Sequence, residues 1–517
     1  MYPSGGIDRG TRVAVAWQGL ARSLICSLQA ADVPQYAQGV GEGTFTRRQV
    51  LAGLGAAAAI GVVGCGDDSG AGPDVDAGID PDAPPDAINA CTATSTMTPV
   101  ELLAHVETII VLCMENRSFD HYLGSLRLLE NRTDVDGLAG TEANPTSAGG
   151  SVPVHNLQDF TPADPPHGWS ACHQQWNNGA NDGFVKAHAG SSEADVMGYH
   201  VRSQIPVTYA IADAGVVCNR WFAGCLGPTW PNRFYLHGAT SKGIQSNLPA
   251  LGFTSIFDRL AAANVTATNY YSDVAWATGG YGKLGGLATI ERFFEDAGAG
   301  HLPPFAIIDP AFAGGGANDD HPDHDIRMGQ ALIASVVAAL GQSPQWSKCL
   351  LVVTYDEHGG FFDHVPPPAT VDADPDFRNL GFRVPTIVIG PTVRRGCAID
   401  DVFEHSSVAA TAQIKWALPT LNARAAQATD LSRCIDPQRI ANPLPPPVVP
   451  PVAISRSALT ARQEHARRTN QISHPELMAA VTAMQPPRAL DRRADTDAIA
   501  WRVLAWGERL GAVRLEP

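Results

Sequence analysis

Three short segments of this sequence carry polar side chains whose types and spacing could bind a metal ion and present a nucleophile. In the first, Glu115 and Asn116 stand side by side directly after the apolar, β-branched run Thr108–Met114. A carboxylate and a carboxamide at the end of a strand offer two hard oxygen ligands for a divalent cation. The same pair could also cap a helix in a solvated turn, so this segment alone does not decide between the two.

The second segment places two acids after another apolar run. Asp356 and Glu357 follow Cys349–Thr354, and Gly359 and Gly360 come next. Neighbouring carboxylates repel each other unless a cation or a hydrogen-bond donor lies between them. Glycines without side chains allow another stretch of backbone to approach closely. This pattern favours a cation held between the two acids.

The third segment, residues 227–233, reads G-P-T-W-P-N-R. Its glycine and two prolines fix a tight loop that presents one hydroxyl, that of Thr229. Thr229 could equally be an ordinary loop residue and Trp230 plain packing. Arg117, close to the first segment, could pair with an internal acid instead of contacting a phosphate.

The elements that must position these segments alternate between strands and helices. Continuous apolar runs predict strands that are covered on both faces; they are Thr108–Met114, Phe305–Ile308, Cys349–Thr354 and Thr386–Ile389. Helical spacing predicts a long helix at Ile326–Leu340 and a short one at Thr254–Ala263, followed by a strand at Val265–Tyr270. The alternation predicts an α/β fold with a mostly parallel central sheet sandwiched by helices. Ligands of such folds collect beyond the carboxyl ends of the strands, where two of the three segments lie.

The three segments together resemble a known family. The runs E-N-R-S-F-D-H-Y, G-P-T-W-P-N-R and Y-D-E-H-G-G-F-F-D-H-V-P-P-P are similar to those of the bacterial phosphoesterase family of non-haemolytic phospholipases C and related acid phosphatases. That family belongs to the alkaline phosphatase superfamily, and the likeness covers residues 105–420. It implies an alkaline-phosphatase-like fold and hydrolysis of phosphoric esters.

The resemblance also implies roles for individual residues. Glu115, Asn116, Asp356 and Glu357 would bind one divalent metal ion, calcium or zinc, that also binds the hydroxyl of Thr229. Thr229 would attack phosphorus and form a phosphothreonine intermediate, which water then hydrolyses. Asn232 would face the phosphate.

Histidines of the family's pocket map onto this chain with several candidates. His167 or His173 is the first candidate and His321 the second, and we expect His321 to protonate the departing alcohol. His364 is expected to be structural. Exposure in a turn explains His358 as well as a role in the pocket does, and His405 receives no role.

The substrate remains open between two classes of ester. Acid phosphatases of the family carry serine at the nucleophile and phospholipase-like members often carry threonine, which favours a phospholipid. The alternative is an acid phosphatase or phosphodiesterase acting on small soluble esters. A second alternative is a non-catalytic, surface-displayed binding protein, which four intact ligand candidates and an intact nucleophile disfavour.

The ends of the chain suggest export. Residues 1–65 resemble a twin-arginine signal, T-R-R-Q-V-L, followed by a small apolar run and a lipobox-like V-V-G-C at Cys65. Residues 66–99 are rich in Asp, Pro, Ala and Gly, which predicts a disordered linker. The catalytic domain is predicted at 100–442 and a Pro-rich connection with a helical segment at 443–517. We expect a protein of the periplasm or cell surface, anchored through Cys65 and without a transmembrane helix.

Charge and cysteines complete the predictions. The net charge of −16, with no run of Lys and Arg, argues against nucleic-acid binding. Cys113 and Cys349, inside apolar runs, are expected to be free. Cys218 with Cys225, or Cys397 with Cys434, are possible disulfides. The oligomeric state stays undetermined.

Overall fold

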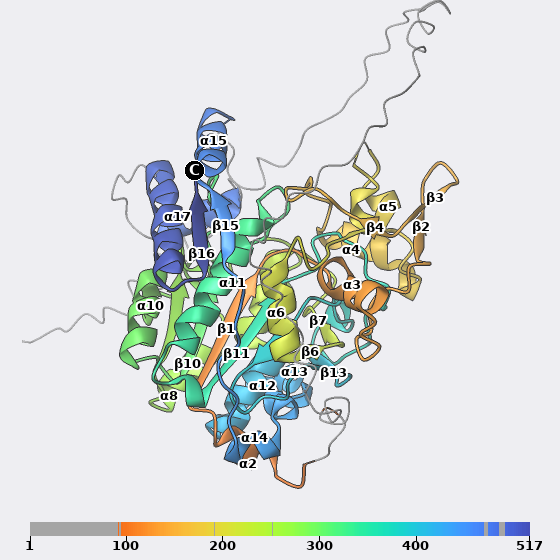
Figure 1. Ribbon diagram of the computed structural model, residues 1–517. Helices are drawn as coiled ribbons and strands as arrows, with labels where there is room; N and C mark the ends of the chain where they lie inside the picture. The colour runs from red at the N-terminus through yellow and green to blue at the C-terminus, as the bar shows by residue number, and fades with distance from the viewer. Residues whose placement is uncertain (1–90, 92–94, 191, 251, 470–473, 485–491) are drawn as a thin grey trace, which may run out of the picture. The chain divides into compact units, whose positions relative to one another are not determined.

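A computed structural model describes residues 91, 95–190, 192–250, 252–469, 474–484 and 492–517 (Figure 1). The predicted signal region, with the anchor at Cys65, lies outside the described residues, as does nearly all of the predicted linker. The domain boundaries therefore stay predictions. No helix among the residues that the structure describes is both long and apolar enough to span a membrane.

A sheet of eight strands forms the centre, in the order β13-β6-β12-β11-β1-β10-β8-β9. Its strands are β1 (Thr108–Met114), β6 (Val216–Cys218), β8 (Ala267–Tyr271), β9 (Leu287–Thr289), β10 (Phe305–Asp309), β11 (Cys349–Tyr355), β12 (Ile387–Ile389) and β13 (Cys397–Ile399). The pairings on both sides of β12 are antiparallel and the other five are parallel. The prediction of a mostly parallel α/β sheet is thus confirmed.

Strands β1 and β11 lie at the middle of this sheet because they are apolar on both faces. Every residue of both strands is buried. They pair in register from Thr108 with Cys349 to Met114 with Tyr355. Burial of such β-branched and aliphatic residues supplies the main driving force for the fold, at about 25 cal/mol per Å² of apolar surface. The two strands consequently end at the same edge of the sheet.

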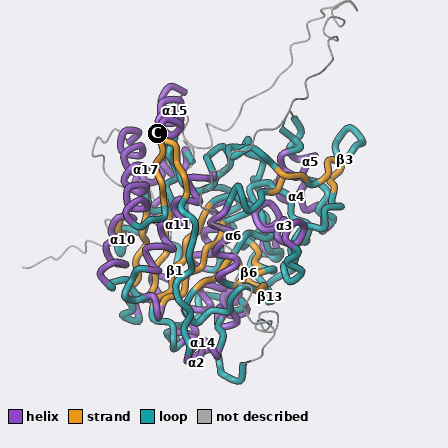
Figure 2. The backbone as a smooth tube through the Cα atoms, in the orientation of Figure 1, coloured by secondary structure: helices purple, strands orange, loops and turns teal. Residues whose placement is uncertain are grey.

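Helices lie around the strands of the central sheet (Figure 2). They are α2 (Pro99–Leu103), α3 (Phe119–Glu130), α4 (Trp169–Trp176), α5 (Phe184–Ala187), α6 (Pro206–Ala214), α7 (Thr229–Gly238), α8 (Ile256–Ala262), α9 (Trp276–Tyr281), α10 (Ile290–Ala299), α11 (Ile326–Gly341), α12 (Ser406–Lys415), α13 (Ala423–Gln427), α14 (Pro437–Ala441), α15 (Arg456–Thr469), α16 (Pro475–Met484) and α17 (Arg492–Arg509). Helices α6, α10, α11 and α17 pack side by side, and α7 packs against α8 and α12. The predicted helices at Ile326–Leu340 and Thr254–Ala263 are α11 and α8.

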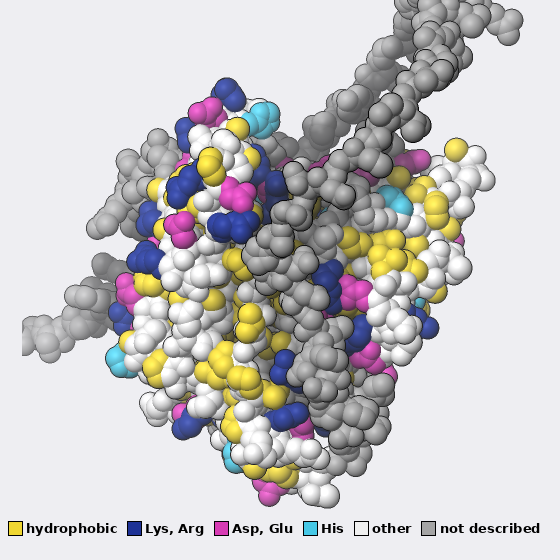
Figure 3. Space-filling view, in the orientation of Figure 1, with side chains coloured by type: hydrophobic (Ala, Val, Ile, Leu, Met, Phe, Trp, Pro, Cys, Tyr) yellow, Lys and Arg dark blue, Asp and Glu magenta, His cyan; other side chains and the backbone are white. Residues whose placement is uncertain are grey.

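Short strand pairs lie outside the central sheet. They are β2 (Ala143–Pro145) with β3 (Ser151–Pro153), β4 (His155–Asn156) with β5 (Gly198–Tyr199), β7 (Trp221–Phe222) with β14 (Phe403–Glu404), and β15 (Val452–Ser455) with β16 (Val513–Glu516). The last pair lies within the C-terminal segment, which sequence analysis predicted as helical only. Lys and Arg side chains of this segment gather on the surface over α15 and α17 (Figure 3).

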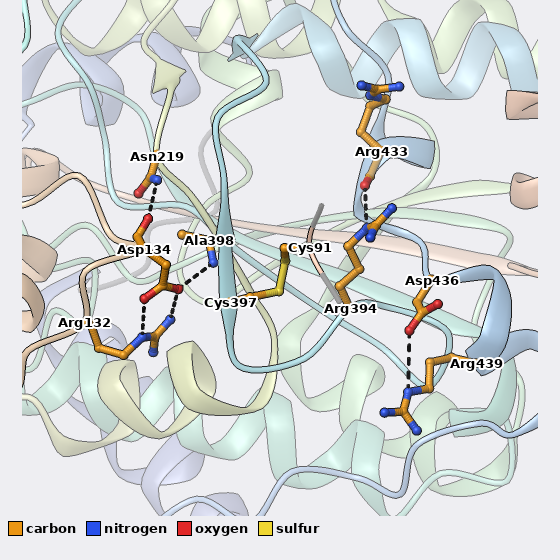
Figure 4. Close-up of a disulfide and its surroundings, with 10 residues drawn as sticks. All are labelled: Cys91, Arg132, Asp134, Asn219, Arg394, Cys397, Ala398, Arg433, Asp436 and Arg439. Atoms are coloured by element: carbon orange, nitrogen blue, oxygen red, sulfur yellow. Dashed lines mark hydrogen bonds and ion pairs between the residues drawn. A yellow bond between two sulfur atoms is a disulfide. The ribbon is translucent and has the colours of Figure 1, made fainter. Parts of the chain in front are cut away.

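One disulfide joins Cys91 to Cys397 (Figure 4). It ties the first described residue to β13, whose Ala398 N–H donates to the Asp134 carboxylate at 2.9 Å. Both disulfides suggested from the sequence are wrong, because Cys397 has a different partner and Cys218, Cys225 and Cys434 are free. Cys113 and Cys349 are free and buried, as predicted.

Candidate active site

The candidate site lies where β1 and β11 end. Asp356 N–H donates to the carbonyl of Met114 at 3.0 Å, and Glu115 N–H donates to the carbonyl of Asp319 at 2.7 Å. Asp319 stands in the loop that follows β10, the other neighbour of β1. Parallel pairing has therefore brought the polar residues after three strands to one edge of the sheet, as expected for folds of this class.

Asn116 occupies an unusual backbone conformation that places it among the acids. Its φ is +60°, in the left-handed region, and its N–H donates to Asp356 Oδ1 at 2.9 Å. Gly359 lies directly against it, so close that a Cβ on Gly359 would come within 2.0 Å of the Asn116 carbonyl oxygen. The close approach that the two glycines predicted thus occurs at Asn116 itself.

The amide of Asn116 turns one terminal atom towards three carboxylates. This atom lies 3.0 Å from Glu357 Oε1, 3.1 Å from Asp356 Oδ1 and 3.2 Å from Glu115 Oε2. If the atom is nitrogen, it donates to the carboxylates. If it is oxygen, acceptors face one another, and a cation among them supplies the missing attraction. Asp356 Oδ2 accepts no hydrogen bond within the described part of the chain. This all-oxygen donor set fits a hard divalent cation.

Burial and mutual repulsion also shape the protonation of these acids. Burial raises the pKa of Glu115 to about 7, partly offset by the charge of Arg233. Burial and the neighbouring Glu115 raise the pKa of Asp356 well above its usual range. Each carboxylate thus needs a compensating positive charge to stay ionised near neutral pH.

Arg233 supplies one such charge from within the protein. Its side chain is fully buried; Nε donates to Glu115 Oε1 at 2.8 Å, and a second guanidinium nitrogen donates to Asp309 Oδ1 at 3.2 Å. Nε also lies 3.7 Å from Asp356 Oδ2. Arg233 belongs to α7, so the same helix that carries the candidate nucleophile also holds the acids in place.

Thr229 is the first residue of α7, directly after Pro228. Its hydroxyl lies 3.2 Å from Glu115 Oε2, to which it donates, and 3.4 Å from Asn116 Oδ1. The N-terminus of a helix carries a partial positive charge, so an anion such as phosphate is favoured beside it. The tight Gly-Pro-Thr-Trp-Pro loop thus places a hydroxyl at the acid cluster.

Two of the candidate histidines reach this cluster. His167 Nε2 lies 3.3 Å from the Asn116 side-chain nitrogen and 3.8 Å from Glu357 Oε1. His321 Nε2 approaches the same amide at 3.0 Å. With Asp164, the two histidines form a further group whose ligand atoms lie close enough together to hold a metal ion. The contacts of His173 lie elsewhere, with the carbonyl and ring of Trp169.

The side chain of Asn232 binds backbone atoms of the loop before Thr229, whereas the resemblance implied that it faces the phosphate. Its side-chain nitrogen donates to the carbonyls of Gly227 and Pro228 at 2.8 and 3.0 Å, and its oxygen accepts from Cys225 N–H at 2.9 Å. These bonds tie down the loop before Thr229. A contact with phosphate would need one of them to break.

Other polar residues singled out in the sequence have internal partners. His358 is buried and lies 2.8 Å from Gln175 Oε1, so its explanation by turn exposure is wrong. His364 lies 2.7 Å from Asp120 Oδ2. His405 Nε2 lies 2.5 Å from the Asp356 carbonyl. Arg117 donates to the carbonyl of Asp320 at 2.7 Å. His405 and Arg117 thus bind the backbone of two loops at the site.

Sequence reasoning missed Arg233, Asp309, Asp319, His324 and His474 as parts of the site. Arg233 belongs to the motif G-P-T-W-P-N-R. Because it lies one helical turn after Thr229, the two side chains could have been predicted to lie on the same face of a helix. Asp319 stands beside His321 in a run of Asn, Asp and His. His474, far along the chain, carries no local signal.

Comparison with known proteins agrees with this architecture. A model of the Phosphoesterase family matches residues 106–419, more than half of the chain, and the chain belongs to this family. It is a phosphoric ester hydrolase.

Relatives with assigned names include plant and bacterial enzymes. Non-specific phospholipase C1 of Arabidopsis thaliana is 34% identical over 365 residues, which span 61% of this chain and 68% of the relative. Phospholipase C B of Mycobacterium tuberculosis is 29% identical over 394 residues, 62% of this chain and 75% of the relative.

Two solved structures share a weak likeness with this chain. A phosphonate monoester hydrolase of Agrobacterium radiobacter aligns with a TM-score of 0.34 and 12% identity, over 64% of this chain and 77% of the other. The lipoteichoic acid synthase LtaP of Listeria monocytogenes gives 0.35 and 7%, over 77% and 97%. Likeness at this level supports no conclusion on function.

Proposed function

We propose that this chain cleaves phospholipids in the manner of a phospholipase C, with Thr229 as nucleophile and a phosphothreonine intermediate. The observation that carries the proposal is the Thr229 hydroxyl, held at the N-terminus of α7 and 3.2 Å from Glu115 in the acid cluster. The relatives named phospholipase C supply the substrate class.

The proposal includes one divalent cation, calcium or zinc. Glu115, Asn116, Asp356 and Glu357 would hold it, with the Thr229 hydroxyl as a further contact. When bound, the cation would lower the pKa of the hydroxyl and balance negative charge on the phosphate. Oxygen ligands alone favour a hard ion such as calcium.

In the first step, Thr229 Oγ1 forms a bond to phosphorus and the bond from phosphorus to the diacylglycerol oxygen breaks. Glu115 Oε2, 3.2 Å from the Thr229 hydroxyl, accepts the hydroxyl proton. A histidine donates a proton to the departing oxygen. In the second step, water attacks phosphorus and gives up a proton to the same histidine, and the bond from phosphorus to Thr229 Oγ1 breaks. Glu115 returns its proton to Oγ1, and the phosphorylated headgroup leaves.

His167 is the better choice for this acid than His321. Nδ1 of His321 lies 2.8 Å from the carbonyl of Pro322, so it carries the proton and leaves Nε2 of the neutral ring a hydrogen-bond acceptor. Burial and the neighbouring His474 lower the pKa of His321 to about 3, which keeps it neutral. Burial by itself lowers the pKa of His167, but Glu357 and Asp164 raise this pKa well above its usual value. The Asp164 carboxylate, which is not among the proposed metal ligands, lies 3.3 Å from His167 Nδ1 and favours the protonated ring.

The second candidate activity is hydrolysis of small soluble phosphate esters by an acid phosphatase or phosphodiesterase. Thr229 is only 3% exposed, which suits a small ester as well as a headgroup. A non-catalytic binding role is not retained, because the chain is a phosphoric ester hydrolase.

Export to the periplasm or cell surface, with a lipid anchor at Cys65, remains part of the proposal. Its support is the twin-arginine and lipobox pattern alone. Palmitate labelling of cells expressing the full chain and a Cys65→Ala variant tests it. An unlabelled wild-type protein would refute the anchor.

The central test compares Thr229→Val, Thr229→Ser and the surface variant Thr141→Val on phosphatidylcholine vesicles and on p-nitrophenyl phosphate. Valine keeps the shape of threonine but lacks the hydroxyl, so turnover should fall by about a thousandfold or more. Serine should retain activity, and Thr141→Val should match the wild type because Thr141 is exposed. Acid-quenched mass spectrometry of the wild type should find phosphocholine on Thr229 with the vesicles and phosphate on Thr229 with p-nitrophenyl phosphate.

Three outcomes separate the alternatives. Turnover of the vesicles with little turnover of the small ester supports the phospholipase, and the reverse supports the acid phosphatase. Full activity of Thr229→Val would refute the covalent mechanism. Activity that survives chelation, with no gain on adding calcium or zinc back, would refute the metal site.

A further inference from the structure

The C-terminal segment, residues 443–517, lies outside the part of the chain that the family model matches, yet it reaches the candidate site. His474, directly before α16, is its point of contact. The side chain is 4% exposed, and its Nε2 lies 3.3 Å from Asp319 Oδ2. Its ring packs edge-on against the ring of His321, with centroids 4.6 Å apart.

Asp319 links His474 to the groups that do the chemistry. Its carbonyl accepts from Glu115 N–H at 2.7 Å, and its Oδ1 accepts from His321 N–H at 3.1 Å. Oδ1 also lies 2.6 Å from His324 Nδ1. His474 Nε2, 3.3 Å away, is the side-chain nitrogen that faces the other carboxylate oxygen, Oδ2, and neither atom has another hydrogen-bond partner in the described part of the chain.

A second link runs from α16 to the nucleophile helix. Glu476 accepts from Asn247 Nδ2 at 2.9 Å, and Asn247 Oδ1 accepts from the N–H of Trp230, the residue after Thr229, at 3.0 Å. Leu477 and other apolar residues of α16 are buried in one cluster with Trp230, Phe312 and Trp276. The segment is therefore packed firmly enough to hold His474 at one position.

We infer that the C-terminal segment completes the active site and that His474 is a positioning residue for Asp319 and His321. By holding Asp319 Oδ2, His474 fixes the loop that binds the backbone of Glu115 and the backbone of His321. Its ring also covers one side of the His321 ring. The catalytic consequence rests on the proposed function; the effect on the loop does not.

The test uses the full chain with His474→Ala, His474→Gln and the control His465→Ala, an exposed histidine of the same segment. We expect His474→Ala to lower kcat on phosphatidylcholine by about tenfold or more with KM changed by less than about threefold. His474→Gln keeps an N–H donor and should recover most of the kcat. Hydrogen exchange of the peptides that contain Glu115 and His321 should quicken in His474→Ala alone.

Wild-type kcat and wild-type exchange in His474→Ala would overturn the inference. A loss of melting temperature with kcat and exchange unchanged below the melting point would overturn it too, because His474 would then be merely structural. Failure of the proposed function gives a different pattern. Thr229→Val would stay active, while hydrogen exchange in the His474 variants would still decide the inference.

Discussion

At the scale of single residues, the site depends on how several buried acids are kept ionised together. Arg233 lies among Glu115, Asp309 and Asp356 with no exposure of its own, and it donates to the first two. A buried charge that loses its partner is far more costly than an exposed one, because neither water nor another group replaces the contact. Arg233 is therefore the residue on which the acid cluster depends most directly.

Replacing Arg233 by Met should destabilise the protein by about 3–5 kcal/mol, because the acids around it lose their buried cation. Urea unfolding measures the change. Arg395→Met is the matched control, because Arg395 is exposed; it should stay within about 0.5 kcal/mol of the wild type. A free energy of unfolding for Arg233→Met within about 1 kcal/mol of the wild type would contradict the role assigned to the arginine.

At the scale of elements, the backbone segments that follow β1 and β11 lie closer together than a side chain at position 359 would allow. Gly359, at φ +65°, meets the backbone of Asn116, which itself adopts φ +60°. Both conformations are uncommon outside glycine and asparagine. The turn after β11 thus contacts the backbone of Asn116 and holds its side-chain amide next to the acids.

Gly359→Ala should displace Asn116, since the added Cβ would stand 2.0 Å from its carbonyl oxygen. We expect a loss of about 1–3 kcal/mol in stability from the strained backbone. Turnover should fall by about a hundredfold, because a misplacement of this size disrupts alignment. Thermal unfolding and assays on phosphatidylcholine vesicles measure the two effects.

Gly285→Ala serves as the control for that substitution, because a Cβ at Gly285 meets no atom within 4 Å. It should leave both properties near the wild type. Full activity of Gly359→Ala would show that Asn116 does not need this close contact.

At the scale of the whole molecule, the disulfide between Cys91 and Cys397 spans 306 residues and encloses most of the catalytic region. Closing so long a loop restricts the unfolded chain more than the folded one. The chain that enters α2 is thereby fastened to β13 at the edge of the sheet. The stability of the domain should accordingly depend on redox conditions.

The Cys91→Ser, Cys397→Ser double variant should be about 2–4 kcal/mol less stable than the oxidised wild type. Chemical unfolding with and without reductant measures this difference. Reductant should lower the wild type to the level of the variant and leave the variant unchanged. Equal stability of the oxidised wild type and the variant would show that the bond contributes nothing to the folded state.

How much of this could be predicted from the sequence follows from the range of the interactions. Apolar runs such as Thr108–Met114 determined the strands, because burial on both faces requires such residues. Short motifs determined the family and singled out the residues that the structure then brought together. The close approach at Gly359 was also predictable, because glycine without a side chain lets another stretch of backbone come near.

Only the tertiary structure decided which distant residues meet. It brought His167, and not His173, next to Asn116 and paired Cys91 with Cys397. It also brought Arg233 to Glu115 after β1 and His474 to Asp319 after β10. These contacts join positions that are far apart in the chain, and their formation depends on the order of strands in the sheet and on the packing of α7 and α16. A local sequence pattern does not specify the order of the strands. A buried charge pair or a disulfide forms only where that order brings its two partners within contact distance.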